Sequence, residues 1–165
     1  MACQAGWFVC VMSAARGHGW LGVVFAAAMV ALHLAVSARP AREARLVATV
    51  MLAGWLWDSA VAKSGLLVYP NGVLIAGTAP YWMAALWALF AIQLNVLFRW
   101  LRVRPISSAC LGAAAGPLSF RAGAALGAVH FTDSGAALVT LAVGWALLLP
   151  ACIALARRWD GVRID

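Results

Sequence analysis

The sequence predicts an all-α protein, a polytopic bundle of about six transmembrane helices with both termini in the cytoplasm. Three observations support this prediction. Hydrophobic residues make up 65% of the 165 residues and charged residues only 10%, whereas soluble domains average about 25% charged residues. Apolar runs suited to a hydrocarbon core of about 30 Å recur along the chain. The arginines gather in the connections between these runs, as they do on the cytoplasmic side of membrane proteins.

The apolar runs divide the chain, as one integral membrane domain over residues 1–165, into six expected spans. They lie at approximately 2–15, 19–38, 46–67, 80–98, 106–131 and 134–156. The first run gives only about 21 Å of helix, so we expect it to be tilted or to have lost residues upstream of Met1. It has neither a basic segment before it nor a small-residue cleavage site, so we expect a retained helix rather than a signal peptide.

The second and third spans each carry polar residues within an apolar run. His33 lies near the inner end of the second span, where we expect it to be packed or hydrogen-bonded. A basic segment separates the two spans, and we expect a helix boundary at its Pro40, because proline interrupts helices. The third span contains Asp58 and Lys63. The uncharged connection that follows holds Tyr69–Gly72, a sequence that favours a tight turn.

The fourth and fifth spans differ in how we expect them to pack. The fourth contains no charged residue, and its Asn95 is expected to hydrogen-bond a neighbouring helix. In the fifth, four glycines fall within roughly 60° of one another on a helix of about 100° per residue. A smooth glycine face lets neighbouring helices approach closely. The residues expected to pack helices here are Gly112, Gly116, Pro117, Gly123 and Gly127.

The sixth span contains Pro150 near its end and is followed by arginines, which completes a strongly asymmetric charge pattern. In a six-span arrangement nine arginines fall on one side of the membrane: Arg39, Arg42, Arg45, Arg99, Arg102, Arg104, Arg157, Arg158 and Arg163. The other side receives only Arg16 and Lys63, with Arg121 near it. The positive-inside rule therefore predicts a multi-pass membrane protein with both termini in the cytoplasm.

Two charged residues within the spans point to a candidate site. Asp58 lies roughly 18 Å and Arg121 roughly 22 Å from the cytoplasmic ends of their spans. Each charge alone is costly in hydrocarbon, so we expect them to pair in the outer half of the bilayer. The hypothesis is a substrate-binding pocket of Asp58, Arg121, Trp82, Tyr81 and His130, with Asp58 and Arg121 as catalytic candidates. The alternative is a structural ion pair that joins two helices.

Familiar enzyme signatures are missing from the sequence. It contains no HExxH, no GxSxG and no glycine-rich phosphate loop. The four cysteines, Cys3, Cys10, Cys110 and Cys152, form no CxxC pair and lie in apolar runs, where cysteine behaves as a small hydrophobe. We therefore expect no metal and no cofactor. The formal charge of +7 belongs to the span ends, so we expect no nucleic-acid binding.

Several stretches resemble a family of bacterial inner-membrane proteins known as a domain of unknown function. The resembling segments are Gln4, Trp7, Asp58-Ser59, Tyr69-Pro70, Pro80-Tyr81-Trp82, Leu86-Trp87, Phe90-Ala91, Leu94-Asn95, Trp100-Leu101, Gly116-Pro117-Leu118-Ser119-Phe120 with Gly123 and Gly127, and Trp145–Pro150. The Gly-Pro-Leu-Ser block is the most specific. Trp57 departs from the pattern, which has a glycine before the aspartate. The resemblance implies an inner-membrane helical protein whose genes accompany those of lipid-modifying enzymes.

These observations lead to one functional prediction and two alternatives. The prediction is a part in membrane lipid or isoprenoid modification, with membrane lipid as the partner and a polar headgroup held by Asp58 and Arg121. The first alternative is a small transporter or flippase component, against which stands the lack of an internal repeat. The second is a non-catalytic scaffold that binds a membrane-protein partner, or a second copy, through the glycine face of the fifth helix.

Overall fold

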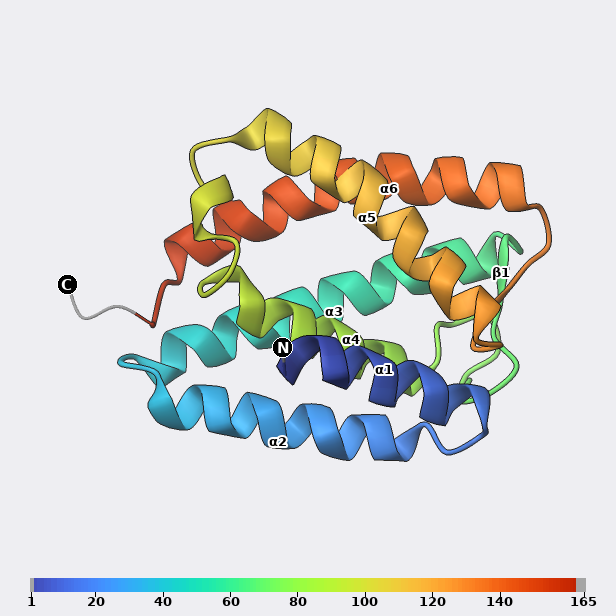
Figure 1. Ribbon diagram of the computed structural model, residues 1–165, viewed down its shortest axis with the longest axis horizontal. Helices are drawn as coiled ribbons and strands as arrows, with labels where there is room; N and C mark the ends of the chain where they lie inside the picture. The colour runs from blue at the N-terminus through green and yellow to red at the C-terminus, as the bar shows by residue number, and fades with distance from the viewer. Residues whose placement is uncertain (1, 163–165) are drawn as a thin grey trace.

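The computed structural model describes residues 2–162, which form six α-helices with almost no sheet (Figure 1). The predicted all-α fold is therefore confirmed. In chain order the elements are α1 (Ala2–Ala15), α2 (Trp20–Val36), α3 (Pro40–Lys63), β1 (Leu67–Val68), α4 (Tyr81–Leu94), the 3-10 helix η1 (Arg99–Leu101), α5 (Pro105–Ala125), β2 (His130–Phe131) and α6 (Ser134–Arg158).

The ends of α3, α4 and α5 differ most from the expected ones. Helices α3 and α5 begin at Pro40 and Pro105, because proline suits the first helical position, where no N–H is needed. Helix α3 therefore begins six residues before the expected start of the third span. Helix α5 ends at Ala125, and Gly127 follows with φ +83, a left-handed conformation that glycine adopts without strain. Helix α4 ends at Leu94 rather than near residue 98.

Helix α4 is the centre of one group of helices, and α5 and α6 form a separate hairpin. Helix α4 packs against α1, α2 and α3, whereas α5 packs mainly against α6. Figure 1 shows the α5–α6 hairpin above the other helices. At one end of the molecule β1 pairs antiparallel with β2, with Leu67 opposite Phe131. This ribbon joins the connection after α3 to the connection after α5.

The connections gather at two opposite ends of the bundle. Figure 1 shows the α2–α3 and α4–α5 connections at the same end as the end of α6. Of the arginines that the sequence assigned to one side, Arg39, Arg99, Arg102 and Arg104 lie in these connections, Arg42 and Arg45 lie in the first two turns of α3, and Arg157 and Arg158 lie at the end of α6. The α1–α2, α3–α4 and α5–α6 connections lie at the other end. We call the first the basic end of the molecule.

The outer faces of the helices carry exposed apolar side chains. Large examples on α1, α2, α3, α5 and α6 are Phe8, Val24, Leu32, Leu52, Leu56, Leu118, Val139, Val143 and Leu147. Helix α4, in contrast, has most of its side chains buried. Among the described helices, α3 and α6 are long and apolar enough to cross a membrane by length and composition, while α1, α2 and α4 are shorter apolar helices.

Tryptophan rings lie over glycines of facing helices, which explains the close approach of the helices. A Cβ atom on Gly54 of α3 would lie 1.9 Å from the Trp87 ring of α4, and one on Gly116 of α5 would lie 2.3 Å from the Trp145 ring of α6. Gly112 of α5 likewise meets the backbone of α6. Small residues are therefore required at these crossings.

The expected glycine face of the fifth helix is correct only in its first half. Gly112 and Gly116 are covered by α6 of the same chain, with Pro117 beside them inside the helix. Gly123 meets only Val129, at 3.8 Å, and Gly127 lies beyond the helix end. The glycines that pack closely therefore serve a contact within the chain, and binding of a partner through this helix stays a prediction.

Candidate functional site

Asp58 is a fully buried carboxylate near the end of α3. Its Oδ2 accepts a hydrogen bond of 2.6 Å from Nε1 of Trp87 on α4. Its Oδ1 has no hydrogen-bond partner among residues 2–162. A buried charge is stable only when it is paired or hydrogen-bonded. Half of this carboxylate is therefore free to accept a hydrogen bond from another molecule.

Asp58 opens onto a cavity of about 170 Å³ at the junction of five helices. The lining is largely aromatic and includes Trp7 of α1, Trp82, Trp87 and Phe90 of α4, Phe120 of α5 and Trp145 of α6. Gln4, Gln93 and Ser119 add polar groups. Asp58 is the one charged side chain among the described lining residues. A mostly apolar hollow with a few polar groups is the usual form of a ligand site.

The aromatic wall is rigidly packed. The rings of Trp87 and Trp145 stack with their centroids 4.9 Å apart and an interplanar angle of 8°, and Phe90 meets both edge-on. Such pairs add about 0.5–1.5 kcal/mol beyond their burial. The stack fixes the indole that bonds Asp58. Nε1 of Trp145 is buried and lacks a partner within the described chain, so the wall also holds an unused donor.

The cavity adjoins a groove on the molecular surface, and a hydrogen bond joins two of the residues that line both. Nε1 of Trp7 on α1 donates to Oγ of Ser119 on α5 over 3.0 Å. The groove, about 660 Å³ between α1 and α5, has Phe8 and Leu118 in its walls and shares Gln4, Trp7 and Ser119 with the cavity. We call it the lateral groove. The shared residues form the boundary between the interior and the surface.

The structure brings together only some of the residues proposed from the sequence. Trp82 lines the Asp58 cavity, but Tyr81 and His130 do not, and His130 is exposed on β2. The expected pairing of Asp58 with Arg121 is wrong, because Asp58 bonds Trp87 and Arg121 is exposed on α5. Arg121 lies four residues before the end of α5, so its guanidinium can extend toward the polar edge of a bilayer.

Tyr69 is a neighbour of Asp58 that the sequence did not single out as functional. Its side chain is buried, and its hydroxyl has no partner in the described part of the chain. Burial raises the pKa of Tyr69 well above its usual value, and the Asp58 charge raises it further. The phenol therefore stays neutral at every physiological pH. It had been expected only as part of a turn.

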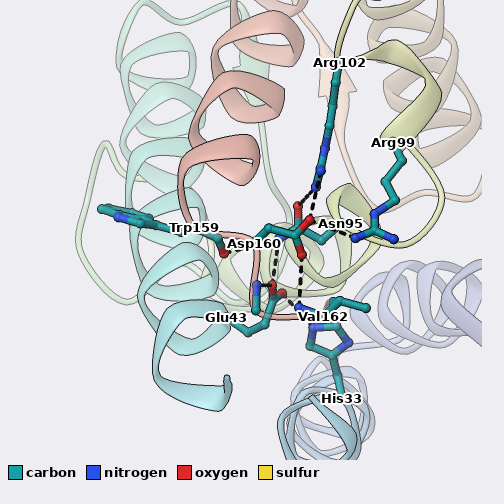
Figure 2. Close-up of polar contacts among 9 residues, drawn as sticks. His33, Glu43, Asn95, Arg99, Arg102, Trp159, Asp160 and Val162 are labelled. Carbon is teal, nitrogen blue, oxygen red and sulfur yellow. Dashed lines mark hydrogen bonds and ion pairs between the residues drawn. The ribbon is translucent and has the colours of Figure 1, made fainter. Parts of the chain in front are cut away.

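A second buried polar cluster lies at the basic end, centred on Glu43 of α3 (Figure 2). Its Oε1 accepts hydrogen bonds of 2.7 Å from Nδ2 of Asn95 and from the backbone N–H of Gly161, and its Oε2 lies 2.9 Å from Nε2 of His33. Glu43 is fully buried. The expectations that His33 is hydrogen-bonded and that Asn95 bonds a neighbouring helix are confirmed.

The cluster continues through Asp160, just after α6. Its Oδ2 accepts hydrogen bonds from Arg99 at 2.8 Å and from Arg102 at 2.9 Å, while Arg102 also donates to Oδ1 of Asn95 at 2.6 Å. Partial burial raises the pKa of Asp160, but the bonds from Arg99, Arg102 and the Val162 N–H outweigh it and lower the pKa to about 2. The polar side chains shown in Figure 2 thus link the end of α2, the start of α3, the connection after α4 and the segment after α6.

The Glu43 cluster suits a structural role better than chemistry. Glu43 and Asp160 both have their charges satisfied by donors from the same chain, unlike Oδ1 of Asp58. Glu43 was not expected to be functional, because it lies among the arginines of residues 39–45, which have the composition of a basic loop. The signal that could have revealed it is Pro40, which starts a helix and places Glu43 in the first turn.

No group of three or more His, Cys, Asp or Glu side chains within residues 2–162 is arranged to hold a metal ion.

Comparison with known proteins gave no match among curated proteins and none among solved structures. A family model does match, over residues 1–151. The chain therefore belongs to the family described as "Protein of unknown function (DUF2878)".

Proposed function

We propose that this protein lies in the bacterial inner membrane and takes part in lipid or isoprenoid modification by binding an amphiphilic ligand at Asp58. The observation that supports this proposal is the unpartnered Oδ1 of a fully buried carboxylate beside an aromatic cavity. A ligand hydroxyl or ammonium group that donates to Oδ1 would supply the missing partner. Asp58 could also accept a proton from that group, which is the simplest catalytic role for a carboxylate.

Placement in a membrane is supported by the exposed apolar side chains on five helices and by two helices of spanning length and composition. Large exposed apolar surfaces mark contact with a partner or a membrane. We propose that all six helices lie in the bilayer, with the shorter ones tilted or partly interfacial. The arginine-rich basic end would face the cytoplasm. Asp58 then lies in the outer half.

The sizes of the two hollows favour a ligand with a long tail. A cavity of about 150 Å³ accommodates a molecule the size of benzene, so the Asp58 cavity of about 170 Å³ holds a polar group and a short apolar segment. The remainder of a lipid or isoprenoid would pass between Trp7 and Ser119 into the lateral groove of about 660 Å³. In this arrangement the ligand enters from the lipid phase, by opening one hydrogen bond.

The test is a lipid mass-spectrometry profile of cells that lack the protein, express it, or express Asp58→Asn. Asp133→Asn is the matched control, since Asp133 caps α6 outside the cavity and asparagine is an equally good cap. We expect a lipid class that changes with the intact protein and with Asp133→Asn, but not with Asp58→Asn at equal protein level. A profile that Asp58→Asn reproduces fully would refute the role of Asp58.

A further inference from the structure

A groove of about 490 Å³ lies at the basic end, between the start of α5 and the end of α6. Its polar lining consists of Arg102, Arg157, Arg158 and Ser108. Pro150 and Ile153 of α6 are among the apolar residues that complete it. We call it the arginine groove. It shares no lining residue with the Asp58 cavity.

The arginine groove carries uncompensated positive charge. Arg157 and Arg158 are exposed and form no ion pair with any residue from 2 to 162. Arg102 is held in place by Asp160 and Asn95. Asp160 is the nearest carboxylate in this network, and it is already shared between Arg102 and Arg99. Two of the three arginines that line the groove therefore have no carboxylate partner among residues 2–162, and an anion would be attracted here.

The start of α5 adds to this attraction. Arg104 precedes the helix and provides no side-chain cap, and Pro105 occupies the first turn. The N–H groups of a first helical turn have no partner within the helix and carry the positive end of its dipole. Phosphate groups bind readily at such a position. Pro105, which has no N–H, and Ser108, whose N–H is bonded to the Arg104 carbonyl, line the groove, so the start of α5 contributes through its dipole rather than through free N–H groups of these two residues.

Apolar side chains beside the arginines indicate where the anion comes from. Val103 is 81% and Ile106 79% exposed, and Trp100 is exposed with the Arg104 guanidinium 5.9 Å from its ring centroid. Exposed tryptophan, arginine and aliphatic side chains together are typical of the level of lipid headgroups. A free phosphate ion would use the arginines but would leave these apolar residues uncovered. A phospholipid would cover both.

We propose that the arginine groove binds the phosphate of an anionic phospholipid. The guanidinium groups of Arg157 and Arg158 face the phosphate, and guanidinium suits phosphate through paired N–H donors. The acyl chains lie against Val103 and Ile106. This site rests on the proposed membrane placement but not on Asp58, and basic hollows between helices on the cytoplasmic side are suited to such headgroups.

Native mass spectrometry of the purified full chain in neutral detergent tests this proposal, with phosphatidylglycerol, phosphatidylcholine of the same acyl chains, and inorganic phosphate as probes. We expect phosphatidylglycerol to bind about tenfold more tightly than phosphatidylcholine. The double variant Arg157→Gln/Arg158→Gln should lose this preference. The matched control Arg42→Gln/Arg45→Gln removes the same charge from exposed positions outside the groove and should keep it.

Three results would overturn the proposal. Equal losses in both double variants would show diffuse charge attraction, and equal binding of the two lipids would show no headgroup recognition. Displacement of the lipid by millimolar inorganic phosphate would assign the groove to a free anion. Asp58→Asn should bind phosphatidylglycerol normally, so failure of the Asp58 proposal would leave this result unchanged. Because both arginines are exposed, the groove variant should melt like the control, which shows that it is folded.

Discussion

Removal of the Glu43 side chain should be among the most damaging single changes to this fold. In Glu43→Ala the donors of Asn95, Gly161 and His33 lose their acceptor. A buried donor left without a partner costs about 1–3 kcal/mol. Gly161 is buried and bears this cost in full. Asn95 keeps a weaker bond of 3.4 Å to the Trp159 carbonyl, and His33, with 11% of its side chain exposed, can recruit water.

The expected destabilisation is therefore about 3–5 kcal/mol, the range found when one partner of a buried charged network is removed. That corresponds to roughly a hundred- to several-thousand-fold shift in the unfolding equilibrium. Reversible unfolding in mixed detergent micelles with increasing SDS measures the difference. Glu43→Gln keeps one oxygen for the donors and should lose about half as much. A change below about 0.5 kcal/mol in Glu43→Ala would refute the inference that this cluster stabilises the bundle.

Three further changes test other parts of the structure in the same unfolding assay. Trp87→Phe keeps an aromatic ring but removes the donor to Asp58, and should cost about 1.5–3 kcal/mol; an unchanged midpoint would mean that the carboxylate does not depend on that bond. Gly116→Ala should destabilise by about 1–3 kcal/mol because its Cβ would meet a tryptophan ring at 2.3 Å. Gly123→Ala in the same helix has its nearest neighbour at 3.8 Å and should be neutral or stabilising; equal effects would argue against the glycine–tryptophan contact. The folded-state pKa of Asp160, about 2, is below its ordinary 3.8, so its contribution is complete above about pH 4 and disappears as the pH falls toward 2; an unfolding midpoint independent of pH in that window would contradict it.

Hydropathy predicted the helices, because runs of apolar residues long enough to bury are hard to arrange otherwise. The errors lay at the ends, where one residue decides the boundary. Pro40 and Pro105 start helices that a hydropathy reading begins one to six residues later, and Gly127 ends a helix that was expected to continue to residue 131. Such end signals depend on backbone conformation rather than on the apolar pattern.

The candidate site was predicted less well, because depth along a helix says nothing about direction around it. Asp58 and Arg121 were placed at similar heights, yet one faces the centre and the other the outside. At about 100° per residue, Arg121 lies roughly opposite Gly112 and Gly116 on α5, and these glycines face α6, so the helical projection places Arg121 on the outer side. The contact between Asp58 and Trp87 joins two helices and has no signature in either one.

The two-stranded ribbon has a consequence for the shape of any molecule that enters from the lateral groove. It fastens the α5–α6 hairpin to the other helices at one end, through Leu67 and Phe131, and the Glu43 cluster fastens it at the other, through Gly161. These two attachments oppose a rigid-body rotation of the hairpin away from α1. Separation of α5 from α1 therefore requires the hairpin to bend at its middle. Such an opening is a slit, which favours unbranched, slender chains over bulky ring systems.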